Sequence, residues 1–206
     1  MHYTVTETYQ SENRIRGSKF IASVSSIKTQ SDVERILNTV KTEHPTATHY
    51  CYAYLFNLYE PIQFVNDDGE PDGTAGLPIL NVLKSFNLMN VMIVVVRYYG
   101  GRKLGKTGLI DAYSGTAKLA IDHAKTKQII PITKIEVHFG YQHQSILDKL
   151  KSDYTLYELN STYLEFIVLE IGIPVQVATE VIHKLRSFEY LFHKLEVTGE
   201  SFYIEE

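Results

Sequence analysis

A basic, glycine-rich segment, residues 97–108 (the basic turn), is the first part of this sequence that could do chemistry. Within it, Gly100-Gly101-Arg102-Lys103-Leu104-Gly105-Lys106-Thr107 satisfies the phosphate-loop pattern G-x-x-x-x-G-K-[ST]. The segment follows an apolar run and precedes a predicted helix, whose free N-terminal N–H groups would favour an anion. A nucleotide-cleaving site is disfavoured, because no later predicted strand ends in an aspartate that could hold magnesium. The structural alternative is that the glycines serve only a tight turn and close packing.

An acidic loop, residues 66–76, is the second such segment. It places Asp67, Asp68, Glu70 and Asp72 within six positions, a crowding of like charge that needs a cation or hydrogen-bond donors nearby. A hard-metal site is one hypothesis, but the spacing lacks the terminal bidentate Glu of a calcium loop. A paired-carboxylate hydrolase is another, but nothing places two carboxylates around a scissile bond. The structural interpretation is that the Asp-Gly and Pro-Asp-Gly sequences form turns.

The two segments carry opposite charge, so we expect them to meet in space and form one shallow recess. Arg97, Arg102 and Lys103 are the natural partners of the acidic side chains. We predict a binding surface with no catalytic residue, no metal and no cofactor. The predicted binding residues are Asp67, Asp68, Gly69, Glu70, Pro71, Gly73, Thr74 and Gly76 of the acidic loop, and Arg97, Tyr98, Tyr99, Gly100, Gly101, Arg102, Lys103, Gly105, Lys106 and Gly108 of the basic turn.

An aromatic stripe marks a predicted strand over residues 49–56. Tyr50, Tyr52, Tyr54 and Phe56 alternate along this strand and therefore share one face. They could stack bases, as aromatic strands do in RNA-binding sheets. We favour core packing beneath two helices, because helix-covered sheets are common in α+β domains.

His49 and Cys51 share the opposite face of the same strand. A zinc site needs two more ligands at similar spacing, and the sequence offers none. A Cys–His nucleophilic pair needs a contact that neighbours on one strand make poorly, so we expect a buried, hydrogen-bonded histidine. The chain also lacks H-E-x-x-H and G-x-S-x-G, so metalloprotease and α/β-hydrolase functions have no support.

The composition, 44% hydrophobic and 21% charged, is that of a folded globular protein. One cysteine, no apolar run near about 18 residues and no signal-peptide features lead us to expect a cytoplasmic protein without a membrane partner. The net charge of -4 argues against indiscriminate nucleic-acid binding. Residues 1–130 nevertheless carry 14 basic and 12 acidic residues, against 6 and 12 in residues 131–206. An anionic partner therefore belongs to the first part.

Apolar periodicity predicts an α+β protein of two domains, residues 1–130 and 131–206, divided near Pro131. For the first domain it predicts strands at 3–9, 19–24, 49–56 and 91–96, and helices from 31 to 45, from 77 to 86 and from after 106 to about 125. Ser31 and Glu34 are expected to form a capping box. For the second it predicts strands at 134–140, 154–159, 163–171 and 192–198 and helices at 144–150 and 174–187. This is the βαββαβ order of ferredoxin-like domains.

Three stretches together resemble the YigZ/IMPACT family. They are HPTATHYCYAY at 44–54, DDGEPDGTAGLPIL at 67–80 and VVVRYYGGRKLGKTGLIDAY at 94–113. The likeness covers roughly residues 17–125, and its middle motif is long enough to be specific. It implies an N-terminal α/β sandwich like the second domain of a small-subunit ribosomal protein and domain IV of elongation factor G. It also implies a ferredoxin-like C-terminal domain like domain V of that factor.

The sequence departs from the family pattern at three positions. Tyr50 stands where Asn is usual, Thr107 where Gly is usual and Asp111 where Arg is usual. Since the family turn is Gly-Gly-x-Lys-Leu-Gly-x-Gly-Gly-Leu, the match to a phosphate loop is accidental. Asp111 puts an anion one turn into the predicted helix, which weakens a phosphate-attracting surface, although a negative residue suits a helix N-terminus.

The resemblance also implies a role near translation. Eukaryotic relatives regulate a starvation-responsive initiation-factor kinase by competing for its activator, and RNA or ribosome binding by bacterial members is inferred from fold. We therefore expect a non-enzymatic translation-associated regulator that binds RNA, the ribosome or a translation factor through the N-terminal domain, with phosphate or another anion at the glycine-rich turn. Two alternatives stay open: a metal-dependent phosphate-ester or nucleotide-handling enzyme, and a protein–protein regulatory module without nucleic acid.

Overall fold

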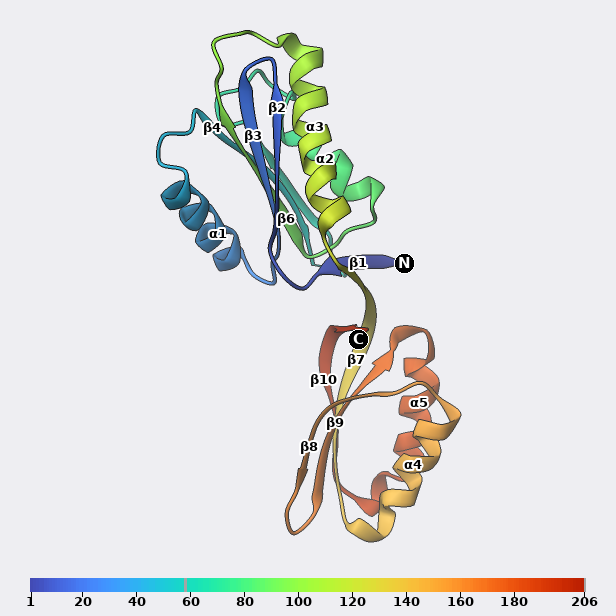
Figure 1. Cartoon of the computed structure of the whole chain (residues 1–206). Helices are drawn as coiled ribbons and strands as arrows, with labels where there is room; N and C mark the ends of the chain where they lie inside the picture. Colours follow the sequence, from blue (N-terminus) through green and yellow to red (C-terminus); the bar gives the residue numbers. More distant parts are fainter. Residues whose placement is uncertain (58, 206) are drawn as a thin grey trace. The chain divides into compact units, whose positions relative to one another are not determined.

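The computed structural model describes residues 1–57 and 59–205, which divide into two compact units, Met1–Gln128 and Ile129–Glu206. Helices pack on sheets in both units (Figure 1). The chain is therefore a mixed α/β protein with two sheets. The predicted domain limits at 130 and 131 remain a prediction about which segments fold independently.

The N-terminal unit is built on an antiparallel sheet with the strand order β2-β3-β6-β4-β5. Its strands are β2 (Tyr9–Ile15), β3 (Ser18–Ser26), β4 (His49–Phe56), β5 (Ile62–Asn66) and β6 (Val91–Tyr98). Residues 91–96 of β6 are all apolar and buried, which suits the central strand of a sheet that is covered on both faces. A short strand, β1 (His2–Val5), is held to this unit by backbone hydrogen bonds between Tyr3 and residues 87 and 89.

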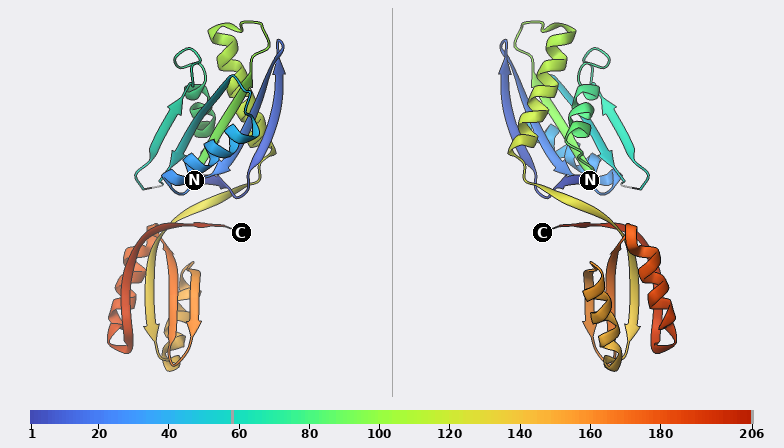
Figure 2. Two further views of the ribbon diagram at one scale, coloured as in Figure 1. Left: turned by 90° about the vertical axis from the view of Figure 1, so that its left-hand side faces the viewer. Right: turned by 90° about the vertical axis from the view of Figure 1, so that its right-hand side faces the viewer.

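Helices cover both faces of this sheet (Figures 1 and 2). Helix α1 (Gln30–Glu43) lies on one face, where Val33, Ile36 and Val40 enter a core with side chains of β3, β4 and β6. Helices α2 (Gly76–Ser85) and α3 (Gly105–His123) lie side by side on the other face. The acidic loop and the basic turn precede these two helices, so the fold brings both segments to the same face.

The first helix begins earlier than the sequence predicted. The capping box is formed by Thr29 and Asp32, not by Ser31 and Glu34. The Asp32 carboxylate accepts the backbone N–H groups of Lys28 and Thr29, each at 3.0 Å, and the Thr29 hydroxyl accepts the N–H of Asp32. Because these bonds start the helix at Gln30, Ser31 lies inside its first turn.

The aromatic stripe of β4 belongs to the core beneath α1. Tyr54 is buried, and Tyr50, Tyr52 and Phe56 are partly buried against the same cluster. The preference for core packing over an open base-stacking strand is confirmed, although α1 alone covers this face among the described residues. Phe64 of the edge strand β5 extends the stack, with its ring 5.5 Å from that of Tyr54.

The C-terminal unit has the predicted βαββαβ order. Its strands pair as β10-β7-β9-β8, and α4 and α5 pack on one face of the sheet. The elements are β7 (Thr126–Phe139), the 3-10 turn η1 (Tyr141–His143), α4 (Gln144–Asp153), β8 (Tyr157–Tyr163), β9 (Ile167–Pro174), α5 (Val175–Ser187), the 3-10 turn η2 (Glu189–Leu191) and β10 (Phe192–Ile204). Alternate residues of β7 and β9 point into the core with Leu147, Val181 and Leu185 of the helices.

Several strand boundaries differ from the predictions. β8 begins later than expected, because Tyr154 caps the end of α4 and packs with Leu156 against the core. β9 also begins later, at Ile167 rather than residue 163. The predicted strand 3–9 is two strands, β1 and the start of β2, and neither the full length of β2 nor β5 was expected from the sequence pattern. β2 is largely polar, and its pairing with β3 depends on the two-residue turn Arg16-Gly17, where both φ angles are positive.

No helix within residues 1–57 and 59–205 is long and apolar enough to cross a membrane.

The tip of the β2–β3 hairpin touches the basic turn. A Cβ added to Gly100 would lie 2.0 Å from the backbone carbonyl of Gly17 and 2.4 Å from the backbone nitrogen of Ser18. Gly100 is therefore required by close backbone approach, which the sequence analysis gave as the structural alternative for the glycines of this turn.

We predict that Gly100→Ala destabilises the protein by about 2–3 kcal/mol, since a methyl group at this position must displace backbone atoms. Gly115→Ala is the matched control, because Gly115 lies inside α3 with no atom within 4 Å of its added Cβ. In a helix interior that change should leave stability equal or raise it by up to about 1 kcal/mol. Urea unfolding followed by circular dichroism measures both, and equal stability of the two variants would contradict the close contact.

Candidate functional site

Two carboxylates of the acidic loop hold the loop itself in shape. Asp67 Oδ1 accepts the backbone N–H groups of Ala75 and Gly76 at 2.9 and 2.8 Å, and Asp67 Oδ2 accepts that of Gly73. It thereby caps α2, whose N-cap residue, Ala75, has no side chain able to do so. Asp68 Oδ2 accepts the N–H of Tyr50 at 2.6 Å and ties the loop to β4. Both carboxylates therefore have a structural role in the loop.

Glu70 forms a buried ion pair with Arg97. Arg97 Nη1 lies 2.5 Å from Glu70 Oε1, and Tyr113 of α3 donates its hydroxyl to the same oxygen at 2.8 Å. Glu70 is 7% exposed and Arg97 4% exposed. Burial raises the pKa of the Tyr113 phenol, so Tyr113 remains a proton donor. The acidic loop and the basic turn therefore meet in space, as predicted.

Arg97 also connects the pair to the sheet. Its Nη2 donates to Ser18 Oγ at 3.3 Å, and the same hydroxyl accepts the backbone N–H of Gly100 at 3.2 Å. The guanidinium lies over the rings of Phe20 and Tyr99, with its Cζ 5.4 and 5.3 Å from their centroids. Arg97 Nε is buried and has no hydrogen-bond acceptor among the described residues.

A recess of about 340 Å³ opens above this pair. Both predicted segments line it, through Glu70 and Pro71 on one side and Arg97, Tyr99, Lys103, Leu104, Gly105, Lys106 and Leu109 on the other. Helix α3 begins here at Gly105, after Leu104, which has no group to cap the helix. The first turn of α3 contains no acidic residue, so its N–H groups and Lys106 give this end positive character.

Several predicted site residues lie away from the recess. Asp67 and Asp68 point to backbone donors, and Arg102 is exposed outside the recess lining. Tyr98 lies on the opposite face of the sheet, where its hydroxyl is 3.0 Å from His44 Nδ1. Among the described residues, Glu70 is the acidic side chain of the recess lining, and it is paired with Arg97. The binding roles of the other predicted residues remain a prediction.

The strand face opposite the aromatic stripe contributes His49 and Cys51. His49 Nδ1 is 2.7 Å from the carbonyl of Asp68, and its Nε2 is 4.0 Å from Glu70 Oε1. The predicted hydrogen bond is therefore present, but the prediction of a buried histidine is wrong, because the side chain is 20% exposed at the loop. Cys51 Sγ lies 3.0 Å from the carbonyl of Asp67 and 3.3 Å from Tyr113 Oη. Within the part of the chain that the structure describes, no three His, Cys, Asp or Glu side chains are arranged to hold a metal ion.

Tyr113 and Ser18 are the site residues that the sequence analysis missed. Tyr113 has the spacing of an ordinary inward-facing residue of α3, between Leu109 and Ala117. Its hydroxyl on an otherwise apolar stripe was the available signal, because a buried phenol needs a hydrogen-bond partner. Nothing in the local sequence around Ser18 indicates its contact with a residue 79 positions away.

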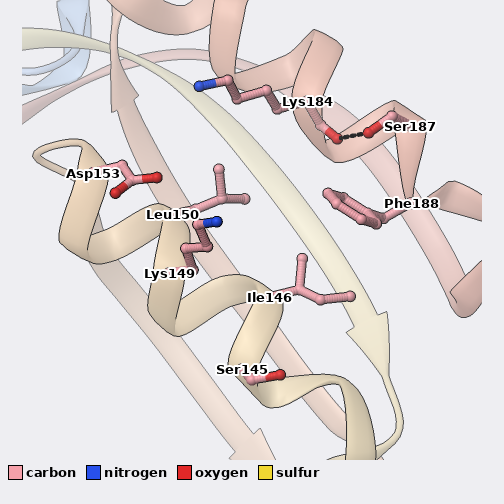
Figure 3. A pocket seen from close by; sticks show the side chains of 8 residues that line it. All are labelled: Ser145, Ile146, Lys149, Leu150, Asp153, Lys184, Ser187 and Phe188. Carbon is pink, nitrogen blue, oxygen red and sulfur yellow. Dashed lines mark hydrogen bonds between the residues drawn. The ribbon is translucent and has the colours of Figure 1, made fainter.

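The C-terminal unit has a roomier groove between α4 and α5, of about 530 Å³ (Figure 3). Its lining includes Ile146, Leu150 and Phe188, with Lys149 and Lys184 beside them. Lys184 is already engaged by the Tyr154 hydroxyl and by Glu180, at 3.5 Å. The groove contains no predicted site residue and lies in the acidic part of the chain, so we place the candidate site in the N-terminal unit.

Comparisons with known proteins agree on one family. The Impact N-terminal domain matches residues 16–121. The IMPACT family member YvyE of Bacillus subtilis is 42% identical over 122 residues, 59% of this chain and 56% of that protein. The IMPACT family member YigZ of Escherichia coli is 32% identical over 176 residues, 84% of this chain and 86% of that protein. A crystal structure of a hypothetical protein aligns with a TM-score of 0.64 and 28% identity, covering 100% of this chain and 97% of that chain.

Replacing Glu70 by Gln should destabilise the N-terminal unit by about 3–5 kcal/mol, because it leaves the buried charge of Arg97 without a counter-ion. Asp72→Asn removes an equal charge from an exposed position of the same loop and should change stability by no more than about 0.5 kcal/mol. Hydrogen exchange of β6 amides in both variants measures the difference. Wild-type protection in the Glu70 variant would show that the pair does not stabilise the site.

Cys51 should be unreactive in the folded protein. Burial raises the pKa of its thiol from an ordinary value near 9 to about 12, so almost no thiolate is present at pH 8. A thiol reagent should therefore modify the native protein very slowly and the urea-unfolded protein fast. Since the folded pKa is the higher one, the stability that this thiol contributes is present below pH 9 and is lost as the pH rises towards 12. Rapid labelling of the native state would refute the buried environment.

Proposed function

The chain belongs to the IMPACT family, and we propose that it is a non-enzymatic, translation-associated regulator whose N-terminal unit binds RNA, free or within the ribosome. The role near translation rests on the family, and the RNA-binding surface is the recess between the acidic loop and the basic turn. We also propose that the protein acts in the cytoplasm. The likeness of its units to domains IV and V of elongation factor G is part of the same proposal.

The observation that carries this proposal is the positive charge at the N-terminal end of α3, beside a Glu70 carboxylate that Arg97 has already neutralised. Lys103 and Lys106 line the recess, and the uncapped N-terminal N–H groups of α3 add the positive end of a 19-residue helix. The one acidic group that lines the recess in the described chain is paired with Arg97. An RNA phosphate placed there would meet donors and positive charge, and Asp111, one turn into α3, lies outside the recess lining.

The enzyme hypothesis has less support from the same geometry. Asp67, Asp68 and Glu70 each accept hydrogen bonds from groups of the protein, at distances of 2.5–2.9 Å. These hydrogen bonds hold the carboxylates in structural roles, and among the described residues no three His, Cys, Asp or Glu side chains are grouped to hold a metal ion. The acidic loop is better explained as the scaffold that places the recess.

Changing Lys103 and Lys106 together to Ala should weaken RNA binding roughly tenfold, about 1.4 kcal/mol, and equally for unrelated RNA sequences. Each lost phosphate contact should also lower the slope of log affinity against log salt by about 0.7. Fluorescence anisotropy with a labelled RNA oligonucleotide, together with co-sedimentation with ribosomes from about 50 to about 200 mM salt, measures both quantities.

The matched control changes Lys118 and Lys125 together to Ala, which removes the same charge from two exposed positions outside the recess lining. It should leave binding nearly unchanged. Binding that does not respond to salt, or an equal loss in all variants, would remove the phosphate-contact proposal. A ribosome interaction that survives nuclease treatment and the lysine changes would instead identify a protein partner.

A further inference from the structure

Tyr99 presents an aromatic ring at the recess wall. Arg97 Cζ lies over this ring, 5.3 Å from its centroid, and Tyr99 is still 46% exposed. The backbone N–H of Tyr99 donates to Thr48 Oγ1 at 3.0 Å, so the residue is anchored where β6 ends. One face of the ring is therefore fixed against a buried cation, which leaves the opposite face for a planar ligand.

The neighbouring groups of the recess suit a phosphate. Lys103, Lys106 and the first N–H groups of α3 lie along the same lining as Tyr99. A second observation points to a ligand independently of the helix end: the side chain of Arg97 is 5% exposed, it lines the recess, and its Nε has no acceptor among the described residues. A buried donor without a partner is rare in folded proteins and is satisfied when an acceptor occupies the site.

From this arrangement we infer that the recess binds one nucleotide of single-stranded RNA, with its base stacked on Tyr99 and its phosphate at the start of α3. The inference rests on the proposed function and specifies its ligand. A volume of about 340 Å³ is at the small end of the range of about 300–1,000 Å³ for small-ligand sites, which fits one nucleotide rather than a duplex. In a duplex the bases are stacked on one another, so no base face is free for Tyr99.

The test compares a single-stranded RNA of about 12 nucleotides, chosen to lack secondary structure, with a duplex of the same length. Tyr99→Leu should weaken single-strand binding by about 5- to 150-fold, because stacking contributes about 1–3 kcal/mol per base. Tyr99→Phe keeps the ring and should bind within about twofold of the wild type. Duplex binding, which uses phosphate contacts alone, should be the same in all three proteins. Tyr190→Leu, at an 81% exposed position in the other unit, is the control.

A spectroscopic reading keeps the inference testable if Tyr99→Leu does not fold. The chain contains no tryptophan, so Tyr99→Trp introduces a single tryptophan, whose emission can be excited selectively at wavelengths that the tyrosines do not absorb. The single-stranded RNA should quench its emission at concentrations that match the anisotropy titration, and inorganic phosphate should not.

The possible failures are distinguishable. If the single strand binds, the lysine changes weaken it, and neither Tyr99→Leu nor Tyr99→Trp shows an effect, then base stacking is wrong and the proposed function stands. If neither RNA binds and ribosomes are not bound either, the proposed function fails together with this inference. Preference for the duplex over the single strand would also overturn the nucleotide assignment.

Discussion

The buried ion pair between Glu70 and Arg97 is the interaction on which the candidate site depends. Removing two charges from water is unfavourable, and here Tyr113 and Ser18 supply further hydrogen bonds that offset this cost. The pair fastens the acidic loop to the central strand and cancels the acidic charge inside the recess. Lys103 and Lys106 therefore line a recess whose buried ion pair carries no net charge. From the residue types alone, we expected a surface of mixed positive and negative charge.

The fold could be predicted where local pattern and tertiary context agree. The apolar run 91–96 identified the central strand, and alternation with amphipathic helices gave the βαββαβ order of the C-terminal unit. The start of α1 could not be chosen locally, because Thr29-x-x-Asp32 and Ser31-x-x-Glu34 both fit a helix start. β5 escapes prediction for another reason: its residues are mostly exposed at the sheet edge, so no buried face shapes their pattern.

The sequence was sufficient to predict that the acidic loop and the basic turn lie close together, but not which side chains in them contact one another. Opposite charge on two loops that precede neighbouring helices was sufficient to place them together. The sequence could not show which carboxylates accept hydrogen bonds within the loop itself, because the donors to Asp67 are backbone N–H groups, which almost any residue provides. It also could not show whether Tyr98 or Tyr99 lines the recess. Successive residues of a strand point to opposite faces, and which tyrosine reaches the recess depends on the register of β6.

That register makes the recess conditional on correct sheet assembly. Arg97 pairs opposite Phe20 of β3 and His49 of β4, so its side chain reaches Glu70 only when three strands are aligned as they are here. A slip of one residue would send Arg97 to the α1 side and leave Glu70 buried without a cation. A sheet with that shifted register would lack the recess, and it would also bury a carboxylate with no counter-ion, which is strongly unfavourable. The pair that shapes the recess therefore also favours the native register of the sheet over its nearest alternative.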